Sequence, residues 1–233
     1  MEEIILDGIS VSVTKKSIKN MYIRVLPPDG TVKISAPRSV SDESICRFAQ
    51  AKLPWIKEQR KLFQEKPCGA KREYITGEYC YVWGRKYRLE VQESDFGSRV
   101  FLSGDNLVLR IKGESDASRR EKLLNEWYRK EMRQTVPRLL KKCGDVVGVH
   151  AKEWQIKNMR TRWGTCNIAK KRIWLNLQLA SKPPECLEYV IIHELVHLLE
   201  RNHNKRFYGY MDVFYPGWRE VRERLNRQGE FYA

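Results

Sequence analysis

The segment that most limits how this chain can fold is YVIIHELVHLL, residues 189–199, because three ionisable side chains stand within an otherwise apolar run. The Pro183-Pro184 pair before it is typical of a helix start, and we predict a helix from Pro183 to about Arg201. The apolar residues require this helix to be buried. A buried ionisable group without a partner is costly, so the polar residues of the segment need a shared role.

The chain has 4 histidines, and three of them, His193, His197 and His203, fall within residues 193–203. On a helix, His193 and His197 project from one face, one turn apart, which lets two imidazoles bind one Zn²⁺ ion. His203 lies just past the expected helix end and can fold back to supply the third ligand. Glu194 can hydrogen-bond a zinc-bound water as a general base without being a ligand itself.

Two features of this site have alternatives. A His-Glu-x-x-His pattern also arises by chance, and a histidine on an apolar helix face is usually a core residue. The concentration of histidines at ligand spacing favours the metal site. The third ligand can instead be Glu220 or Glu223, from a later helix. We favour His203 because this choice gives every histidine of the cluster a role.

The distribution of strand and helix patterns along the chain predicts an α+β fold. An N-terminal β-rich region, residues 1–112, precedes a second region, residues 113–233. The segment RIWLNLQLA, residues 172–180, is expected to be a strand that pairs with an extended substrate or serves only the core. The other expected elements are three antiparallel strands within 1–40, a helical segment near 41–65 split by Pro54, two hairpins within 79–112 and a helix over 116–142.

The composition limits the cellular compartments in which we expect this protein. The 6 cysteines are scattered and form no Cys-x-x-Cys pair, which argues against a disulfide framework and favours a reducing compartment. The N-terminal sequence MEEIILDGISV is not typical of a signal peptide. The longest apolar run is short and interrupted, so we expect no membrane span. We therefore predict a soluble, cytoplasmic protein, and no sequence feature specifies its oligomeric state.

The second unusual feature is the net charge of +15. A surplus of this size attracts nucleic acid or another polyanion. Basic clusters also bracket the histidine segment, which favours an acidic or nucleic-acid-bearing substrate. An alternative function is therefore a basic nucleic-acid-binding protein whose zinc site is structural or vestigial, although the presence of Glu194 speaks against it.

Four segments, taken in order, resemble the YgjP-like metallopeptidase family, also called the domain-of-unknown-function 45 family. They are TRWGTC (161–166), WLNLQLA (174–180), YVIIHELVHL (189–198) and NHNKRFY (202–208). Thr165 stands where the family usually has serine, and Tyr208 where it usually has tryptophan. The N-terminal segments MYIRVLPPDGTVKISAP and WIKEQR are also similar to that family, so the resemblance covers most of the chain.

The resemblance implies a zincin-like catalytic region over residues 113–233, with an HExxH active-site helix. It implies that His193, His197 and His203 bind zinc and that Glu194 is the general base of a zinc metalloendopeptidase acting on proteins or peptides. The catalytic segment is also similar to the WLM and SprT-type proteases, which act on proteins attached to DNA. Tyr208 or Tyr210 can assist the oxyanion or can simply pack.

Overall fold

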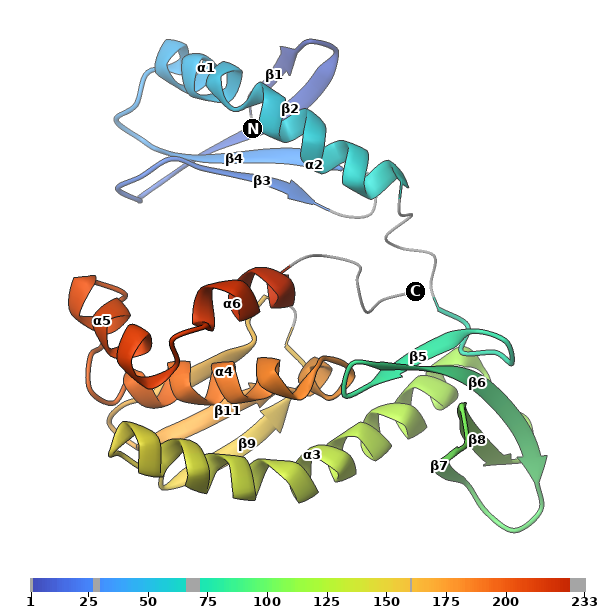
Figure 1. Ribbon diagram of the computed structural model, residues 1–233. Coiled ribbons are helices and arrows are strands. Elements are labelled where there is room, and N and C mark those ends of the chain that lie inside the picture. The colour runs from blue at the N-terminus through green and yellow to red at the C-terminus, as the bar shows by residue number, and fades with distance from the viewer. Residues whose placement is uncertain (1, 27–29, 66–71, 160, 227–233) are drawn as a thin grey trace. The chain divides into compact units, whose positions relative to one another are not determined.

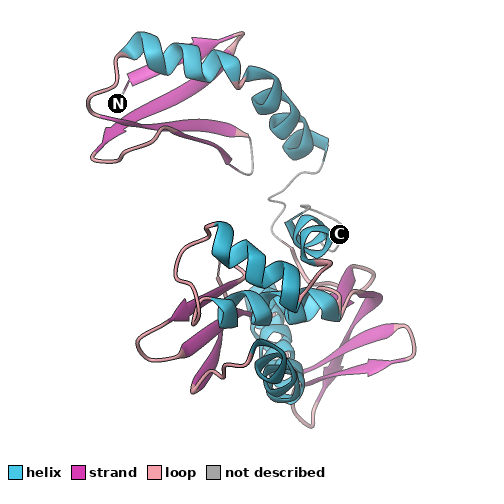
Figure 2. Ribbon diagram, turned by 60° about the vertical axis from the view of Figure 1, so that its left-hand side comes forward, coloured by secondary structure: helices cyan, strands magenta, loops and turns pink. Residues whose placement is uncertain are grey.

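The computed structural model describes residues 2–26, 30–65, 72–159 and 161–226 (Figures 1 and 2). The chain forms two compact units, Met1–Arg72 and Glu73–Ala233, each described here by itself. Strands dominate the first part of the chain and helices the last, which confirms the α+β prediction. None of the helices in the described ranges is long and apolar enough to span a membrane.

The N-terminal unit is one four-stranded sheet with two helices. The strands, in the order β1-β2-β4-β3, are β1 (Glu2–Leu6), β2 (Ile9–Lys16), β3 (Tyr22–Leu26) and β4 (Thr31–Pro37). The prediction of three antiparallel strands is wrong on two points, since the sheet has a fourth strand and its central pair, β2 and β4, is parallel. Alternation in the sequence identifies the buried face of a strand, but it does not identify the neighbour with which that strand pairs.

The predicted helical segment near 41–65 forms two helices, α1 (Asp42–Ala51) and α2 (Leu53–Glu65). Ser41 caps α1 because its side chain accepts a hydrogen bond from the Ser44 amide at 3.4 Å. Pro54 lies in the first turn of α2, where no helical N–H donor is needed. The predicted split at Pro54 is therefore confirmed.

The second unit begins with another four-stranded sheet that repeats the topology of the first. Its strands, in the order β5-β6-β8-β7, are β5 (Tyr79–Val82), β6 (Arg85–Ser94), β7 (Arg99–Ser103) and β8 (Asn106–Lys112). The central pair, β6 and β8, is again parallel. Both first hairpins turn on two consecutive residues of positive φ, Asp7-Gly8 in one sheet and Trp83-Gly84 in the other.

A long helix, α3 (Ala117–Val147), connects this sheet to the rest of the second unit. Asp116 caps its start, and Gly148, with φ of 78°, ends it several residues beyond the predicted position. Leu124 of α3 packs into the core of the β5–β8 sheet, whereas Met132 and Val136 pack into the core of the C-terminal helices. The same helix therefore contributes to both cores.

The unit boundary at Arg72 differs from the domain boundary expected at residue 112. The turn between β5 and β6 explains the difference, because it is bonded to a segment far along the chain. Trp83 N donates to Ala180 O at 2.8 Å, and Gly84 N donates to Ser181 O at 3.3 Å. A Cβ on Gly84 would lie 2.8 Å from the Pro183 ring, so the turn fits closely against the segment that precedes the histidine helix.

The remaining elements surround one buried helix, α4 (Pro184–Val196). It contacts α3, β10, β11, α5 and α6, and Ile191, Leu195 and Val196 are fully buried. Figure 1 shows α4 between two layers, with the strands β9 and β11 below it and the helices α5 and α6 above it. The elements around it are β9 (Glu153–Lys157), β10 (Gly164–Asn167), β11 (Arg172–Asn176), a 3₁₀ helix η1 (Leu177–Ser181), α5 (Lys205–Phe214) and α6 (Trp218–Asn226).

The three short strands form a sheet in the order β10-β11-β9. β11 is central, antiparallel to β10 and parallel to β9. The segment 172–180 is therefore not a single strand at a cleft edge, as one alternative expected. It is a central strand that ends at Asn176 and continues as η1, and the edge strands are β10 and β9.

Candidate metal centre

The end of α4 places two of the histidines. His193 lies in the last turn of the helix, and His197 is its C-terminal cap with φ of −63°. The helix ends at Val196, earlier than the predicted Arg201, because its last bonds tighten. Leu198 N donates to Leu195 O and Leu199 N to Val196 O, both at 2.9 Å, in place of the wider α-helical bonds. His197 keeps its place one turn after His193, as the sequence predicts.

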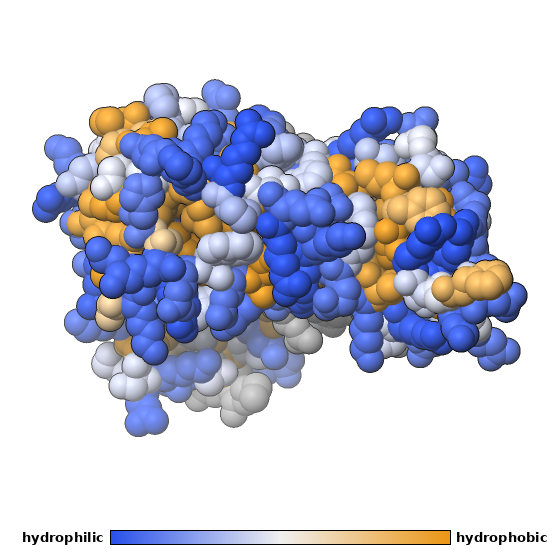
Figure 3. All heavy atoms as spheres, turned by 90° about the horizontal axis from the view of Figure 1, so that it is seen from below, coloured by the Kyte–Doolittle hydropathy of each residue, from blue (hydrophilic) through white to orange (hydrophobic). Residues whose placement is uncertain are grey.

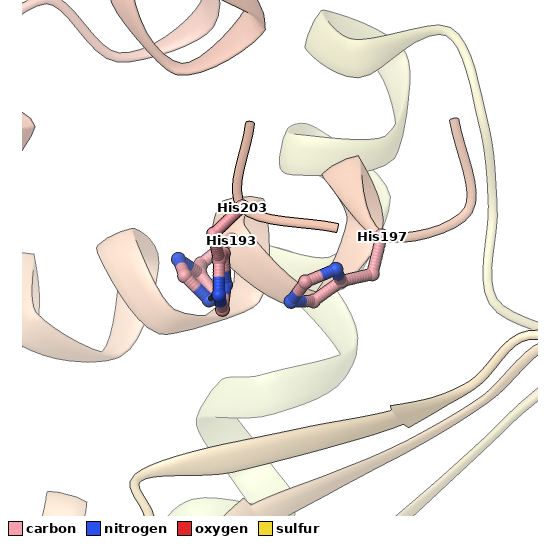
Figure 4. A group of neighbouring side chains, drawn as sticks. All are labelled: His193, His197 and His203. Carbon is pink, nitrogen blue, oxygen red and sulfur yellow. Dashed lines mark hydrogen bonds between the residues drawn. The ribbon is translucent and has the colours of Figure 1, made fainter. Parts of the chain in front are cut away.

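The third histidine reaches the same point from the following loop (Figure 4). Asn204 caps α5 by accepting a hydrogen bond from Phe207 N at 3.0 Å, which fixes the residue just before it, His203. His203 Nε2 lies 3.0 Å from His193 Nε2. One ligand atom from each of His193, His197 and His203 falls within 4.8 Å of the others. The three imidazoles that the sequence singled out therefore converge.

Phe207 forms an apolar floor beneath the cluster. Its side chain is fully buried, and its ring centroid lies 5.0 Å from that of His193, 4.7 Å from His197 and 4.6 Å from His203. The His197 Nδ1 atom lies 3.3 Å from Glu200 O, which leaves Nε2 to face the other rings. The histidines are thus held both by packing and by a backbone contact.

The donor set fits a divalent metal such as zinc. Burial, followed by the neighbouring rings of His197 and His203, lowers the pKa of His193 to about 3, and burial also lowers the pKa of His197 and of His203. Neutral imidazoles have the free lone pair that a metal ion requires, and three of them form a known catalytic zinc set. Within the described residues, no other group of three or more histidine, cysteine or acidic side chains is arranged to hold a metal.

The alternative third ligands are placed differently. Glu220 and Glu223 are exposed on α6, and neither lines the cavity at the histidines. Glu223 lines a neighbouring surface depression, which shares Arg222 and Asn226 with that cavity. The placement of His203 therefore supports it over both glutamates as the third ligand.

Glu194 is a buried carboxyl beside the cluster. Its side chain is 5% exposed and lines the same cavity as the three histidines. Burial raises the pKa of Glu194 to about 8, and the nearby charge of Arg162 acts in the opposite direction. Such a carboxyl has a proton affinity suited to accepting and returning a proton near neutral pH.

The strand β10 passes directly against Glu194. A Cβ on Gly164 would lie 2.6 Å from Glu194 Oε1 and 2.8 Å from both Glu194 Cγ and Val190 Cγ1. No side chain fits there, which explains the glycine of the TRWGTC segment by close approach. Trp163 anchors the same segment to the last helix, because its Nε1 donates to Asn226 Oδ1 at 3.0 Å.

These elements enclose a cavity of about 630 Å³. Its walls come from α4 and the histidine loop, from β10 and from α6. Tyr189 lines it, whereas Tyr208 and Tyr210 do not, since Tyr208 stacks on Trp218 and Tyr210 on Phe214. The lining residues are Arg162, Trp163, Gly164, Thr165, Cys166, Ile168, Tyr189, Val190, His193, Glu194, His197, Arg201, His203, Arg222, Leu225 and Asn226.

Asn176 positions the wall of this cavity, a role that the sequence did not reveal. Its side chain is 2% exposed. Its Nδ2 donates to Met159 O at 2.8 Å and to Arg162 O at 2.7 Å, and its backbone N donates to Trp163 O at 2.9 Å. Strand alternation predicts that Asn176 lies on the face opposite Leu175, but the strand ends there and the Asn176 side chain holds the loop before β10.

Comparison with known proteins identifies the family of the chain. The model of the YgjP-like metallopeptidase domain matches residues 19–228, and the chain belongs to this family of metal-dependent peptidases. No curated protein matches the chain. Among solved structures it is similar to the metallopeptidase zymogen of Pyrococcus abyssi abylysin, with 23% identity over 39% of this chain and 90% of that chain and a TM-score of 0.36.

We expect Asn176→Asp to lower the free energy of unfolding by about 2–4 kcal/mol, because a carboxylate oxygen would replace the donor to two buried carbonyls. The matched control is Asn167→Asp. Asn167 Oδ1 only accepts a hydrogen bond, from Lys170 N at 3.0 Å, so this change should stay within about 0.5 kcal/mol. Urea denaturation measures both, and equal losses would contradict the positioning role of Asn176.

Proposed function

We propose that this protein is a zinc metalloendopeptidase in which His193, His197 and His203 bind Zn²⁺ and Glu194 is the general base. The observation that carries the proposal is the convergence of three imidazoles within 4.8 Å beside a buried carboxyl that is not part of the set. A purely structural zinc site has no use for such a carboxyl, whereas hydrolysis requires one.

Bound zinc supplies Lewis acidity, which lowers the pKa of a water molecule towards about 7 and polarises a carbonyl. Glu194 takes the proton of the attacking water and then returns it to the leaving amine. Phe207 and the Glu200 carbonyl keep the imidazoles in place throughout. The close approach of Gly164 restricts the Glu194 carboxyl to a small set of positions, which favours proton transfer along one path.

The edge strand β10 offers a binding surface for an extended peptide substrate. Among the described strands it pairs with β11 alone, and its residues Gly164, Thr165 and Cys166 line the cavity. An extended peptide can add to such an edge through main-chain hydrogen bonds. This arrangement would hold a scissile bond beside Glu194 without demanding one particular sequence.

The change Glu194→Gln should lower kcat by about 100- to 10,000-fold, because the amide cannot accept the proton of the attacking water. Zinc content should stay at the wild-type level, since Glu194 is not a proposed ligand. Cleavage of a casein or peptide substrate and zinc analysis of the same samples measure both. Glu188→Gln is the matched control, because Glu188 is on the same helix and pairs with Lys142 at 2.6 Å. Turnover at the wild-type rate in the Glu194 variant would exclude the base role.

The change His203→Ala should raise the zinc dissociation constant by at least about 10- to 100-fold, the loss that even an outer-shell partner causes. Competition with a colorimetric chelator measures this constant. His150→Ala is the control, because His150 is exposed and lies near Asp145, outside the cluster. Should Glu220→Gln or Glu223→Gln lower zinc affinity while His203→Ala does not, the third ligand would be that glutamate.

A second candidate function, binding of nucleic acid, is supported by the outer face of the β5–β8 sheet. On these strands Cys80, Leu89 and Leu109 are buried, so the residues that alternate with them point outward. Lys86 Nζ lies 3.8 Å from the centroid of the Tyr79 ring. The residues that define this basic aromatic face are Tyr79, Lys86, Arg88, Arg99, Phe101 and Arg110.

The register of the strands places these side chains in two groups, one on β5 and β6 and one on β7 and β8, with Glu90 between them on the same face. Tyr79 pairs with Arg88 and Arg99 with Arg110, and both Arg99 and Arg110 lie over the Phe101 ring, at 4.9 and 5.4 Å. Figure 3 shows hydrophilic side chains interspersed with hydrophobic ones on the visible face. Arginines interleaved with aromatic rings suit the backbone and bases of a single strand. A peptidase with this face would act on proteins associated with nucleic acid.

The double change Arg88→Gln with Arg99→Gln should weaken binding of a labelled single-stranded oligonucleotide. We expect the slope of log affinity against log salt to fall by about 2, one for each lost phosphate contact. Fluorescence anisotropy over a salt series measures this slope. Arg133→Gln on α3, exposed and away from the sheet strands, is the control. An unchanged slope in the double variant would rule out this face as the nucleic-acid-binding surface.

A further inference from the structure

Three arginines from separate parts of the second unit line the cavity of the candidate metal centre. Arg162 precedes β10, Arg201 follows α4 and Arg222 lies on α6. All three are exposed at the rim. Among the described residues, no carboxylate pairs with these three guanidinium groups of the cavity.

The helix α6 shows that this arrangement differs from an ordinary basic surface. Its other arginines are paired within the fold, since Arg219 reaches Asp212 at 2.5 Å and Arg224 reaches Glu185 at 2.5 Å. Arg222, on the same helix, lines the cavity instead and has its guanidinium 5.9 Å from the Trp218 ring centroid. The arginine without a carboxylate partner is thus the one that faces the candidate site.

The arginines flank both parts of the reaction centre. Arg162 and Arg222 line the same cavity as Glu194 and His203, and they come from different elements. Among the described lining residues, Glu194 is the only acidic one. Three guanidiniums therefore outnumber one carboxylate among these residues, and a metal ion would add to the positive field. A cleft of one sign concentrates ligands of the other sign.

We propose that this arginine rim binds a carboxylate of the substrate next to the scissile bond, so that the enzyme prefers acidic peptides. The inference rests on the proposed peptidase function and names its substrate class. A planar guanidinium matches a carboxylate with two parallel hydrogen bonds, which fixes orientation as well as charge. The carboxylate can belong to an aspartate or glutamate side chain or to the end of a peptide, because the chemistry is the same.

The test compares short labelled peptides of one sequence that differ only at the positions flanking the cleavable bond. One carries aspartate, one asparagine and one lysine there, all with amidated ends, and a fourth carries asparagine with a free terminal carboxylate. For the zinc-loaded protein we expect kcat/KM to be about tenfold higher for a carboxylate-bearing peptide than for the amidated asparagine peptide. The aspartate and free-end peptides separate the two sources of the carboxylate.

The matched variants are Arg222→Gln and Arg219→Gln. Arg222→Gln should bring the aspartate-to-asparagine ratio close to 1, mainly through KM, whereas Arg219→Gln should keep the wild-type ratio because Arg219 is paired with Asp212. Equal rates for the four peptides, or the same loss of preference in both variants, would overturn the inference. Cleavage with no acidic preference would leave the proposed peptidase function standing.

Binding to zinc-loaded Glu194→Gln protein separates the two proposals further. Fluorescence anisotropy with the labelled peptides should show about tenfold tighter binding of the aspartate peptide, even if no peptide is cleaved by the wild-type protein. Preferential binding without cleavage would refute the peptidase and retain the carboxylate site. Equal binding would refute the site. Displacement of the aspartate peptide by a single-stranded oligonucleotide, abolished by Arg222→Gln, would overturn the assignment in favour of phosphate.

Discussion

The burial of α4 is the constraint on which the second unit depends. A helix with Ile191, Leu195 and Val196 fully buried needs apolar neighbours on several sides, and α3, β11, α5 and α6 provide them. The same burial lowers the pKa of His193 and raises the pKa of Glu194, since charged forms are disfavoured away from water. The same packing thus forms the core and shifts the pKa values of side chains at the candidate site.

Residues distant in sequence then fix the geometry around α4. Asn176 holds the loop that precedes β10, Gly164 lets that strand approach Glu194, and Phe207 supports all three imidazoles. Each acts through contact with another group rather than on a substrate. Together they account for a site whose side chains have little freedom, as pre-organised catalysis requires.

The sequence predicts the histidine site well because that site is local. His193 and His197 are one helical turn apart, and His203 follows after a short loop, so spacing alone brings them together. Residues 172–180 were less predictable, since strand alternation places Asn176 on the face opposite Leu175 and does not reveal which backbone groups its side chain binds. The parallel pairing of β2 with β4 and the gathering of Arg162, Arg201 and Arg222 depend on tertiary structure that no local pattern encodes.

The absence of a side chain at Gly164 also bears on how this cavity can diversify. The wall nearest Glu194 is bare main chain, and a Cβ there would meet Glu194 and Val190. A side chain at this position would therefore displace the Glu194 carboxyl. Arg222 lines the same cavity from α6, so it can be exchanged without a change in the wall at Gly164. Variation in what the cavity accepts is thus open to α6 and closed to β10 at Gly164.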